Sequence, residues 1–186
     1  MYKFEDTFID WIKLIKPILF KDKRGFFMES YSKKEFKENW ISWDFVQDNY
    51  SKSKKWVLRW LHFQTKNSQW KLVKVISWEI YDICVDLRKN SKTYWKYFWI
   101  ILDDSEKNIL YIPPWIAHWF LVLKNNTIVS YNCDKYYDEK NNIGISYDDK
   151  FLNINWWDYF DMDKIILSKK DKNLISFKEY EKNNKF

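Results

Sequence analysis

At 186 residues the chain suits one domain with a core of its own, and its net charge of +6, from 32 Lys and Arg against 26 Asp and Glu, is modest and spread along the chain. Its aromatic residues alternate with aliphatic ones, as in a core, rather than with basic ones, so we expect no nucleic-acid partner. Two cysteines are too few for a disulfide framework or a zinc cluster, and neither a leader nor a membrane-length apolar run is visible, so we expect a cytoplasmic protein that does not enter a membrane.

The N-terminal residues are expected to be mostly extended. Residues 1–20 alternate weakly between apolar and polar side chains, and a charged turn at 21–25 ends in one of the two glycines. Residues 26–31 then read as a strand in which Glu29 stands among apolar neighbours.

The best helix candidate covers residues 32–39. Ser32 can cap its first turn, Glu35 follows three residues later, and Asn39 stands near its end. A strand rich in side-chain amides follows at 45–50. The helix is short, so it predicts a small addition to a fold made mainly of strands.

The stretch at 57–64 carries one of the two histidines of the chain. If it is a strand, His62 and Gln64 share one face, and Arg59 lies three residues before the histidine. Histidine transfers protons near neutral pH, and a guanidinium can hold an anion beside it. The alternative is a core histidine that hydrogen-bonds to the backbone.

Short strands continue through the second half of the chain. Two segments, 71–77 and 79–88, look like a hairpin that turns at Ser77-Trp78. Further strands are predicted at 97–102, 109–112, 119–123 and 127–133. This spacing, with little helix, predicts an all-β sandwich or barrel. One domain spans residues 1–186, and from about residue 172 we expect a polar C-terminal tail or a weak helix.

The chain is unusually rich in tryptophan and poor in glycine, with 13 Trp and 2 Gly. An ordinary domain has about 7% glycine, which turns need because only glycine takes positive φ freely. Trp40, Trp78 and Trp115 stand where turn residues are usual, in Asn-Trp, Ser-Trp and Pro-Trp pairs. We therefore hypothesise that the source reads as glycine a stop-type codon that the printed sequence renders as tryptophan.

Five segments occur in an order and at a spacing that is specific. They are DKRGFF (22–27), FVQDN (45–49), LRWLHFQ (58–64), QWKLV (69–73) and AHWF (117–120). Together they closely resemble the dTDP-4-dehydrorhamnose 3,5-epimerase family, and the resemblance runs from about Pro17 to Asp171. It implies a cupin jelly-roll barrel or sandwich with a few short helices. It also implies glycine at seven of the tryptophans and a genuine tryptophan at Trp156. The seven are Trp60, Trp70, Trp78, Trp95, Trp99, Trp115 and Trp119.

The resemblance implies a proton-transfer reaction without cofactor or metal. The substrate would be a dTDP-linked 4-keto-6-deoxy sugar, dTDP-4-dehydro-6-deoxy-D-glucose, which becomes dTDP-4-dehydro-L-rhamnose on the route to dTDP-L-rhamnose. The protons at C3 and C5 are both α to the C4 ketone, so inversion needs a base on one face and an acid on the other. By resemblance His62 is the base, Asp171 orients it, Lys71 stabilises the oxyanion and Tyr131 donates the proton from the opposite face.

The remaining implied site residues bind the nucleotide sugar. Arg24, Arg59 and Lys170 would meet the diphosphate, for which the planar guanidinium of arginine is well suited. Glu29, Gln47, Asn49 and His118 would line the site, and Tyr136 would stack on the thymine. Asn142 departs from the family, which has a glutamate there, and this puts one binding contact in doubt. The family also implies a homodimer in which Arg24 reaches the site of the partner.

Three other functions compete with 3,5-epimerisation. A related 3-epimerase or 5-epimerase would share the same base, acid and oxyanion donor. A non-catalytic cupin that binds sugar nucleotides is favoured if the tryptophans beside His62, Lys71 and His118 are real, because indoles would crowd the site. A metal-dependent cupin oxygenase needs several His or carboxylate ligands, and His62 and His118 are the only histidines.

Overall fold

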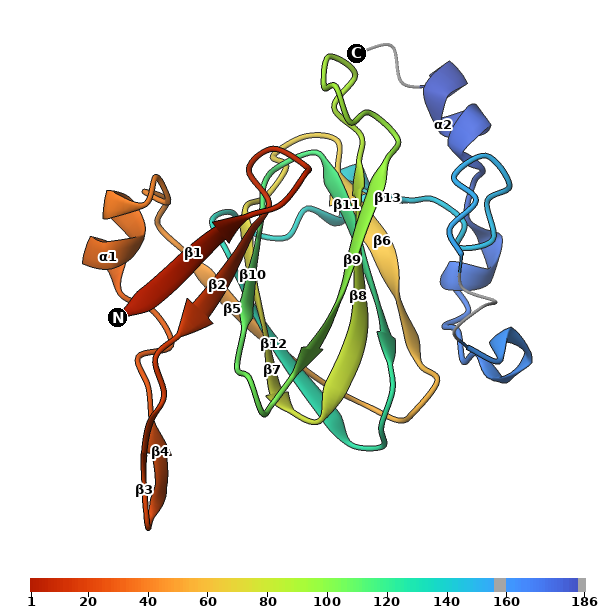
Figure 1. Ribbon diagram of the computed structural model, residues 1–186. Coiled ribbons are helices and arrows are strands. Elements are labelled where there is room, and N and C mark those ends of the chain that lie inside the picture. Colours follow the sequence, from red (N-terminus) through yellow and green to blue (C-terminus); the bar gives the residue numbers. More distant parts are fainter. Residues whose placement is uncertain (156–159, 184–186) are drawn as a thin grey trace.

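The chain folds into two antiparallel β-sheets that face each other, which confirms the all-β jelly-roll prediction (Figure 1). The structure is a computed structural model that describes residues 1–155 and 160–183, without the side chains of residues 60–62 and 183. The candidate site lies at one end of the interior between the two sheets.

One sheet has six strands in the order β1-β2-β10-β7-β12-β5. Their bounds are β1 (Tyr2–Asp6), β2 (Lys13–Pro17), β5 (Gln47–Ser53), β7 (Lys71–Ser77), β10 (Ile109–Ile112) and β12 (Thr127–Cys133). The other sheet has five strands in the order β13-β6-β11-β8-β9. Their bounds are β6 (Leu58–Gln64), β8 (Glu79–Asp86), β9 (Tyr97–Asp103), β11 (Ile116–Val122) and β13 (Asn142–Gly144).

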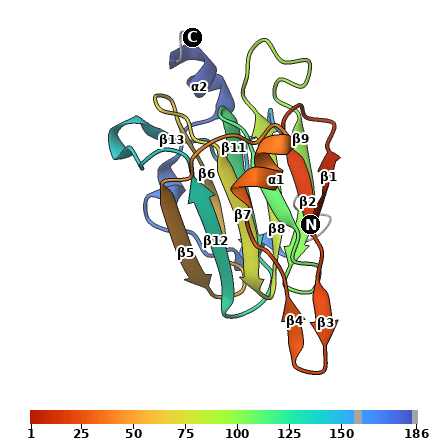
Figure 2. The same cartoon turned by 90° about the vertical axis from the view of Figure 1, so that its left-hand side faces the viewer.

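A separate two-stranded hairpin projects from the body of the molecule (Figures 1 and 2). It consists of β3 (Phe20–Asp22) and β4 (Gly25–Phe27), and its residues are all exposed. We call it the arm. Three aromatic side chains of the arm are about half exposed or more, namely Phe20, Phe26 and Phe27. An apolar surface on a projecting segment is typical of a binding interface.

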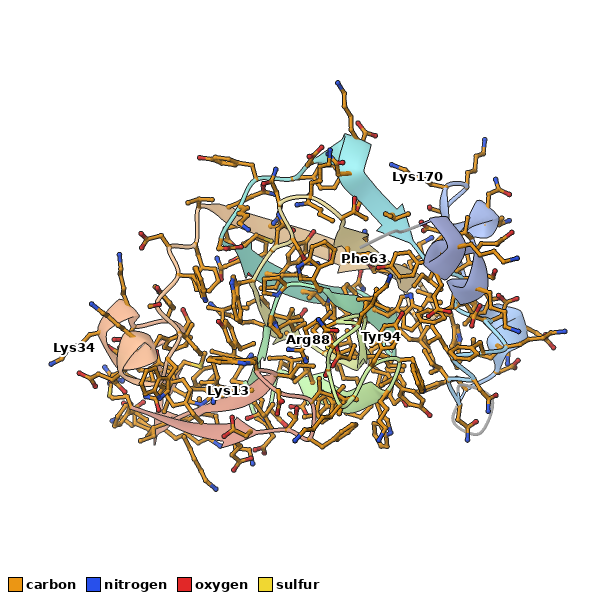
Figure 3. All side chains as sticks on the ribbon, turned by 90° about the horizontal axis from the view of Figure 1, so that it is seen from above. Lys13, Lys34, Phe63, Arg88, Tyr94 and Lys170 are labelled. Atoms are coloured by element: carbon orange, nitrogen blue, oxygen red, sulfur yellow. The ribbon has the colours of Figure 1, made fainter. Side chains whose placement is uncertain are left out.

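The helices are short, as predicted. Helix α1 (Lys33–Glu38) confirms the prediction at 32–39, although the Ser32 side chain makes no cap hydrogen bond and Glu35 pairs with the N-terminal amino group instead. The 3₁₀ turns are η1 (Glu139–Asn141), η2 (Met162–Lys164) and η3 (Asp171–Asn173), and the chain ends in α2 (Phe177–Asn183). Lys34 on α1 and Lys170 beside η3 lie on opposite sides of the molecule (Figure 3). In the described part of the chain, no helix has the length and apolarity that crossing a bilayer requires.

Alternation along the strands separates apolar layers on the two faces of each sheet, and two of these layers involve the five-stranded sheet. Between the sheets lie Val73, Ile80, Phe120, Val129 and their neighbours, which are buried. On the outer face of the five-stranded sheet, a second cluster packs under the C-terminal segment, and its members include Leu58, Phe63, Tyr81, Trp119 and Phe177. Both faces of the five-stranded sheet are therefore covered, which is why β8 and β11 are buried along almost their whole length.

The predicted hairpin at 71–77 and 79–88 is wrong in its pairing. Strands β7 and β8 have nearly the predicted bounds, but β7 pairs with β10 and β12, whereas β8 pairs with β9 and β11. Only Trp78 separates the two strands. A single residue is too short for a two-residue hairpin turn, and the chain instead crosses from one sheet to the other there.

Of the two alternatives predicted for the residues after about 172, the short helix is present as α2, and the polar tail is wrong. Phe177 and Tyr180 lie three residues apart on α2, and both are buried against the outer cluster of the five-stranded sheet. This aromatic pair gives the helix an apolar face among many lysines and asparagines. A pattern of only two apolar residues is too short to predict from the sequence that the helix is buried. Trp156, predicted to be a genuine tryptophan, lies outside the described residues.

Candidate active site

A cavity of about 360 Å³ opens at one end of the space between the sheets. At this end β5 and β7 begin while β6 and β12 end, so side chains from both sheets converge. Its lining is mostly polar and comprises Gln47, Asn49, Phe63, Gln64, Ser68, Gln69, Lys71, Ile116, Tyr131, Cys133, Tyr137 and Asn142. Of the residues predicted for the site, the cavity thus brings together Gln47, Asn49, Lys71 and Tyr131.

Lys71 is the cation of this cavity. Burial lowers the pKa of its ammonium, and the negative or potentially negative groups around it (Cys133, Cys84 and Asp82) partly oppose that change. The pKa of the Cys133 thiol is itself raised to about 11 by burial, so this thiol is neutral at physiological pH. An ammonium at this place would interact with an anion formed inside the cavity more strongly than it would in water.

Tyr131 stands on β12 between two strands of the same sheet. Its backbone pairs with Asn49 of β5 and with Val73 of β7. Burial raises the pKa of its phenol, while the charge of Arg59 acts in the opposite direction. Arg59 belongs to the facing sheet, and its Nε donates to the Ser53 hydroxyl at 2.9 Å. The phenol stays protonated over the physiological range and can serve as a proton donor.

The amide side chains around the cavity are fixed by hydrogen bonds. The Gln47 amide donates to Asn49 Oδ1 at 2.8 Å, and its carbonyl accepts from the Tyr137 backbone at 3.0 Å. Gln64 donates to the Asn67 carbonyl at 2.8 Å and accepts from the Asp138 backbone at 2.6 Å. These bonds tie the loop after β12 to β5 and β6, so the cavity wall is held in place before any ligand binds.

His118 lies deeper between the sheets and is 8% exposed. Its Nε2 is 2.8 Å from Oδ2 of Asp82, a carboxylate on β8 that is completely buried. Because a carboxylate only accepts, the imidazole nitrogen donates in this hydrogen bond. His118 does not line the cavity, and its observed partner is this carboxylate.

The backbone of His62 lies on β6, between β13 and β11 of the five-stranded sheet. It pairs with His118 on one side and with Gly144 on the other. Gln64, two residues further along β6, lines the cavity. The side chain of His62 lies outside the described residues, so its role stays a prediction.

The C-terminal segment runs alongside β6. Ile166 forms a bridge with Val57, and Ile175 forms one with Ile145, which directly follows the partner of His62. Asp171 lies between these two bridges and is 9% exposed, and its Oδ2 accepts from the Ser168 backbone at 3.3 Å. Lys170, next to it, is exposed and lies 3.4 Å from Glu139.

Besides Arg59, His118, Lys170 and Asp171, three further residues predicted for the site do not line this cavity. Arg24 is on the arm, where its guanidinium binds Asp22 with an N–O distance of 2.5 Å. Glu29 faces Tyr2, whose phenol has its pKa raised by burial and by the charge of Glu29. Tyr136 is 72% exposed on the loop after β12.

Four polar residues of the lining were not predicted as site residues, namely Gln64, Ser68, Gln69 and Tyr137. For Gln64 the signal was present, because it shares a strand face with His62. Tyr137 had no such signal, since it follows Tyr136 in an irregular loop. Asn142, at the position where the resemblance implies glutamate, donates to the Tyr137 hydroxyl at 3.2 Å. It therefore supports the cavity wall through Tyr137.

Comparison with known proteins agrees with this fold and with the predicted resemblance. A sequence profile of the family described as dTDP-4-dehydrorhamnose 3,5-epimerase matches residues 6–179. The enzyme of that name from Methanothermobacter thermautotrophicus is 41% identical over 178 residues, which cover 96% of each chain. The crystal structure of dTDP-4-dehydrorhamnose 3,5-epimerase from Elizabethkingia anophelis superposes with a TM-score of 0.89 at 38% identity, covering 96% of this chain and 97% of that one.

A third relative carries a ligand. The crystal structure of the epimerase RmlC from Legionella pneumophila, in complex with dTDP-4-keto-L-rhamnose, has a TM-score of 0.90 at 37% identity and covers 95% of this chain and 93% of its own. The profile spans nearly all of the sequence, and relatives of about 40% identity cover it almost completely. This chain belongs to the dTDP-4-dehydrorhamnose 3,5-epimerase family.

Proposed function

We propose that this protein catalyses the 3,5-epimerisation of dTDP-4-dehydro-6-deoxy-D-glucose to dTDP-4-dehydro-L-rhamnose without a cofactor. The observation that carries the proposal is the placement of Lys71 and Tyr131 in one cavity of a chain that belongs to this family. An ammonium and a phenol are the two groups that an enolate mechanism needs in addition to a base.

The chemistry follows from the C4 ketone of the substrate. Removing the proton from C3 or from C5 places negative charge on the same C4 oxygen, so one cation can serve both steps. The buried ammonium of Lys71 would stabilise that oxyanion, and such stabilisation is commonly a large part of catalysis. Tyr131, whose pKa is raised by burial, would return a proton from the face opposite the base.

We assign the base to His62 and the orientation of its imidazole to Asp171. The assignment is supported by the backbone of His62 pairing with Gly144, and by Asp171 lying between the two bridges that the C-terminal segment makes, at Val57 and at Ile145. Arg59, Gln47 and Asn49 would hold the substrate from the facing strands. The tautomer of a histidine is set by the hydrogen bond that its other ring nitrogen makes, often with a carboxylate.

The test is proton exchange in heavy water with purified protein and the 4-keto sugar nucleotide. Deuterium at both C3 and C5, followed by NMR, is expected for a 3,5-epimerase. Exchange confined to one carbon would replace the proposal by a 3- or 5-epimerase. Binding of the nucleotide sugar without any exchange would show a non-catalytic binding protein. His62→Ala is expected to abolish exchange at both carbons, and full activity in that variant would refute the assigned base.

We further infer a homodimer in which the arm reaches a second copy of the chain. Arg24 lies in the turn between β3 and β4, in a hairpin whose aromatic residues are exposed, and it does not line the cavity of its own chain. Seated on a partner, the arm would bury Phe20 and Phe27 and bring a guanidinium to the nucleotide diphosphate there. Lys170, Glu29 and Tyr136 would complete the binding of the diphosphate, sugar and thymine in such a shared site.

Complementation tests the shared site directly. Arg24→Ala and Lys71→Met should each be nearly inactive as pure proteins. After unfolding and refolding together, mixed dimers should regain activity, because one of their two sites then has both residues intact. Phe27→Ser should shift the protein toward monomer in sedimentation, with Phe151→Ser, exposed on the C-terminal side, as the matched control. A monomeric wild type, or no recovery on mixing, would overturn the inference.

A further inference from the structure

Six tryptophans have a backbone conformation that suits glycine. Ten non-glycine residues in the described part of the chain have left-handed φ values. The tryptophans among them are Trp11, Trp40, Trp56, Trp78, Trp95 and Trp115, with φ between 59° and 72°. In this region the Cβ atom of an L-residue crowds the following carbonyl, and a bulky side chain there is a rare outlier.

Trp40 occupies the position that ends helix α1. The Trp40 amide donates to the Lys37 carbonyl at 3.2 Å, and the Ile41 amide donates to the Phe36 carbonyl at 2.9 Å. This pair of bonds, with a left-handed residue directly after the C-cap Asn39, is a Schellman motif. Glycine is the usual residue at that position. The Trp40 side chain is 77% exposed, so its indole adds almost nothing to the core.

Three more tryptophans stand at the third residue of a hydrogen-bonded turn. The closing bonds run from Ile12 N to Ile9 O at 3.1 Å, from Val57 N to Lys54 O at 3.3 Å, and from Lys96 N to Thr93 O at 2.9 Å. The third residues are Trp11, Trp56 and Trp95, and each has positive φ. In a β-turn of type II this place requires positive φ and is therefore filled by glycine or asparagine.

The last two shape connections that the fold depends on. Trp78 is the single residue between β7 and β8, and its amide donates to Asp104 Oδ2 at 2.8 Å. Trp115 follows two prolines, and its amide donates at 2.8 Å to the hydroxyl of Ser68, which lines the site cavity. The left-handed conformation at 115 thus supports the cavity wall through the backbone.

The six left-handed tryptophans differ both from the other left-handed residues and from the other tryptophans. Three of the remaining four left-handed residues are Asn67, Asn126 and Asn153, and asparagine is the residue that tolerates this region best after glycine. The Trp70 ring, by contrast, packs against another ring: it stacks on Tyr111 with centroids 5.0 Å apart and planes 11° apart. Trp119 is fully buried within a strand. Left-handed tryptophans are therefore a distinct set, defined by the backbone.

We propose that the functional protein carries glycine at positions 11, 40, 56, 78, 95 and 115, because its source decodes as glycine the codon that is rendered here as tryptophan. Two independent observations converge on this set: the 2 glycines against 13 tryptophans of the sequence, and the φ values of the folded chain. Positions 11 and 56 come from the structure alone, since neither sequence motif nor resemblance singled them out. The proposal concerns the covalent chain and is independent of the epimerase reaction.

Mass spectrometry of the protein isolated from its source decides the matter. Each of the six positions should give a peptide lighter by the difference between a tryptophan and a glycine residue. Trp70 and Trp119 are read in the same experiment, and the family resemblance predicts glycine there as well. Tryptophan at the six positions would overturn the proposal whether or not the protein proves to be an epimerase.

Recombinant variants test the physical reason. Replacing the six tryptophans by glycine should raise the folding equilibrium constant by about tenfold per position, as expected for relief of left-handed strain. Replacing the same six by alanine removes the indoles but keeps the Cβ atoms, so it should give little of this gain. Trp43→Gly, a stacked tryptophan without left-handed φ, should not stabilise the protein. Equal stability of the glycine and alanine proteins in urea would refute backbone strain as the cause.

Discussion

The imidazole of His118 and the carboxylate of Asp82 lie 2.8 Å apart in the interior between the two sheets. Asp82 also lies 4.0 Å from the Cys84 sulfur, and its charge opposes the fall in the pKa of Lys71 that burial causes. The pair joins β8 to β11, and through the charge of Asp82 it also acts electrostatically on Lys71. Since Asp82 is completely buried, its charge acts on Lys71 with little screening by water.

Activity should fall at alkaline pH as Lys71 loses its proton. Burial lowers the pKa of Lys71, so the ammonium loses its proton at a lower pH than free lysine does, whereas the raised pKa of Tyr131 moves ionisation of the phenol to higher pH. Asp82→Asn removes a negative charge that favours the ammonium, and the pKa of Lys71 should fall further. The alkaline limb of the kcat profile should accordingly move to lower pH.

A second buried aspartate of β8 is the control for this measurement. Asp86 accepts hydrogen bonds from Arg88, Ser91 and Thr93, at 2.8, 2.6 and 2.6 Å. Asp86→Asn should destabilise the fold by about 1–3 kcal/mol through lost or unsatisfied hydrogen bonds. It should leave the alkaline limb in place. A limb that moves equally in both variants would contradict the role given to Asp82.

Tyr131→Phe should separate inversion from proton exchange. A base on one face can still remove and return a proton there, whereas inversion needs the donor on the other face. Inversion is expected to fall by roughly 10²- to 10⁴-fold while deuterium exchange falls much less. Both rates come from one NMR experiment in heavy water. Tyr50→Phe, on the outward and exposed side of β5, should change neither.

Asp171→Asn should weaken turnover more than binding. If Asp171 orients the imidazole of His62, its loss should lower kcat by roughly 10²-fold or more and change KM little. The fold should persist, because an asparagine oxygen can still accept from the Ser168 backbone. Asp149→Asn is the counterpart: it weakens the hydrogen bonds to three backbone amides, including that of Phe177, and should lower the melting temperature without changing kcat.

Gly144→Ala should destabilise the protein by contact rather than by backbone strain. A Cβ atom at position 144 would lie 2.3 Å from Leu174 Cδ1, so about 1–3 kcal/mol of stability should be lost. Leu174→Ala should recover part of this loss in the double variant. Gly25→Ala has no neighbour within 4 Å but has φ of 131°, so its destabilisation should be insensitive to changes at 174. Urea unfolding of the four proteins measures both effects.

The sequence determined most of the strands, the short helix α1 and the family, although the strand predicted at 26–31 is wrong beyond Phe27, where β4 ends. Period-2 alternation and turn residues act over a few neighbouring positions, and they predicted β10 and β12 to the residue. The ordered motifs identified the family, and the imbalance of tryptophan and glycine pointed to misread glycines. All of this information is local or compositional, so it can be read without knowing which strands meet.

Only the tertiary structure decided which strands pair and which side chains lie next to each other. The pairing of β7 and β8 was predicted wrongly because alternation does not state which sheet a strand joins, and the burial of α2 depends on an apolar face presented by a distant strand. The same reason hid Tyr137 and Asp82, which come from a loop and a strand far from His62 in sequence. Backbone hydrogen bonds and packing across the two sheets fix these neighbours, and they also hold six tryptophans at φ values that glycine adopts without strain.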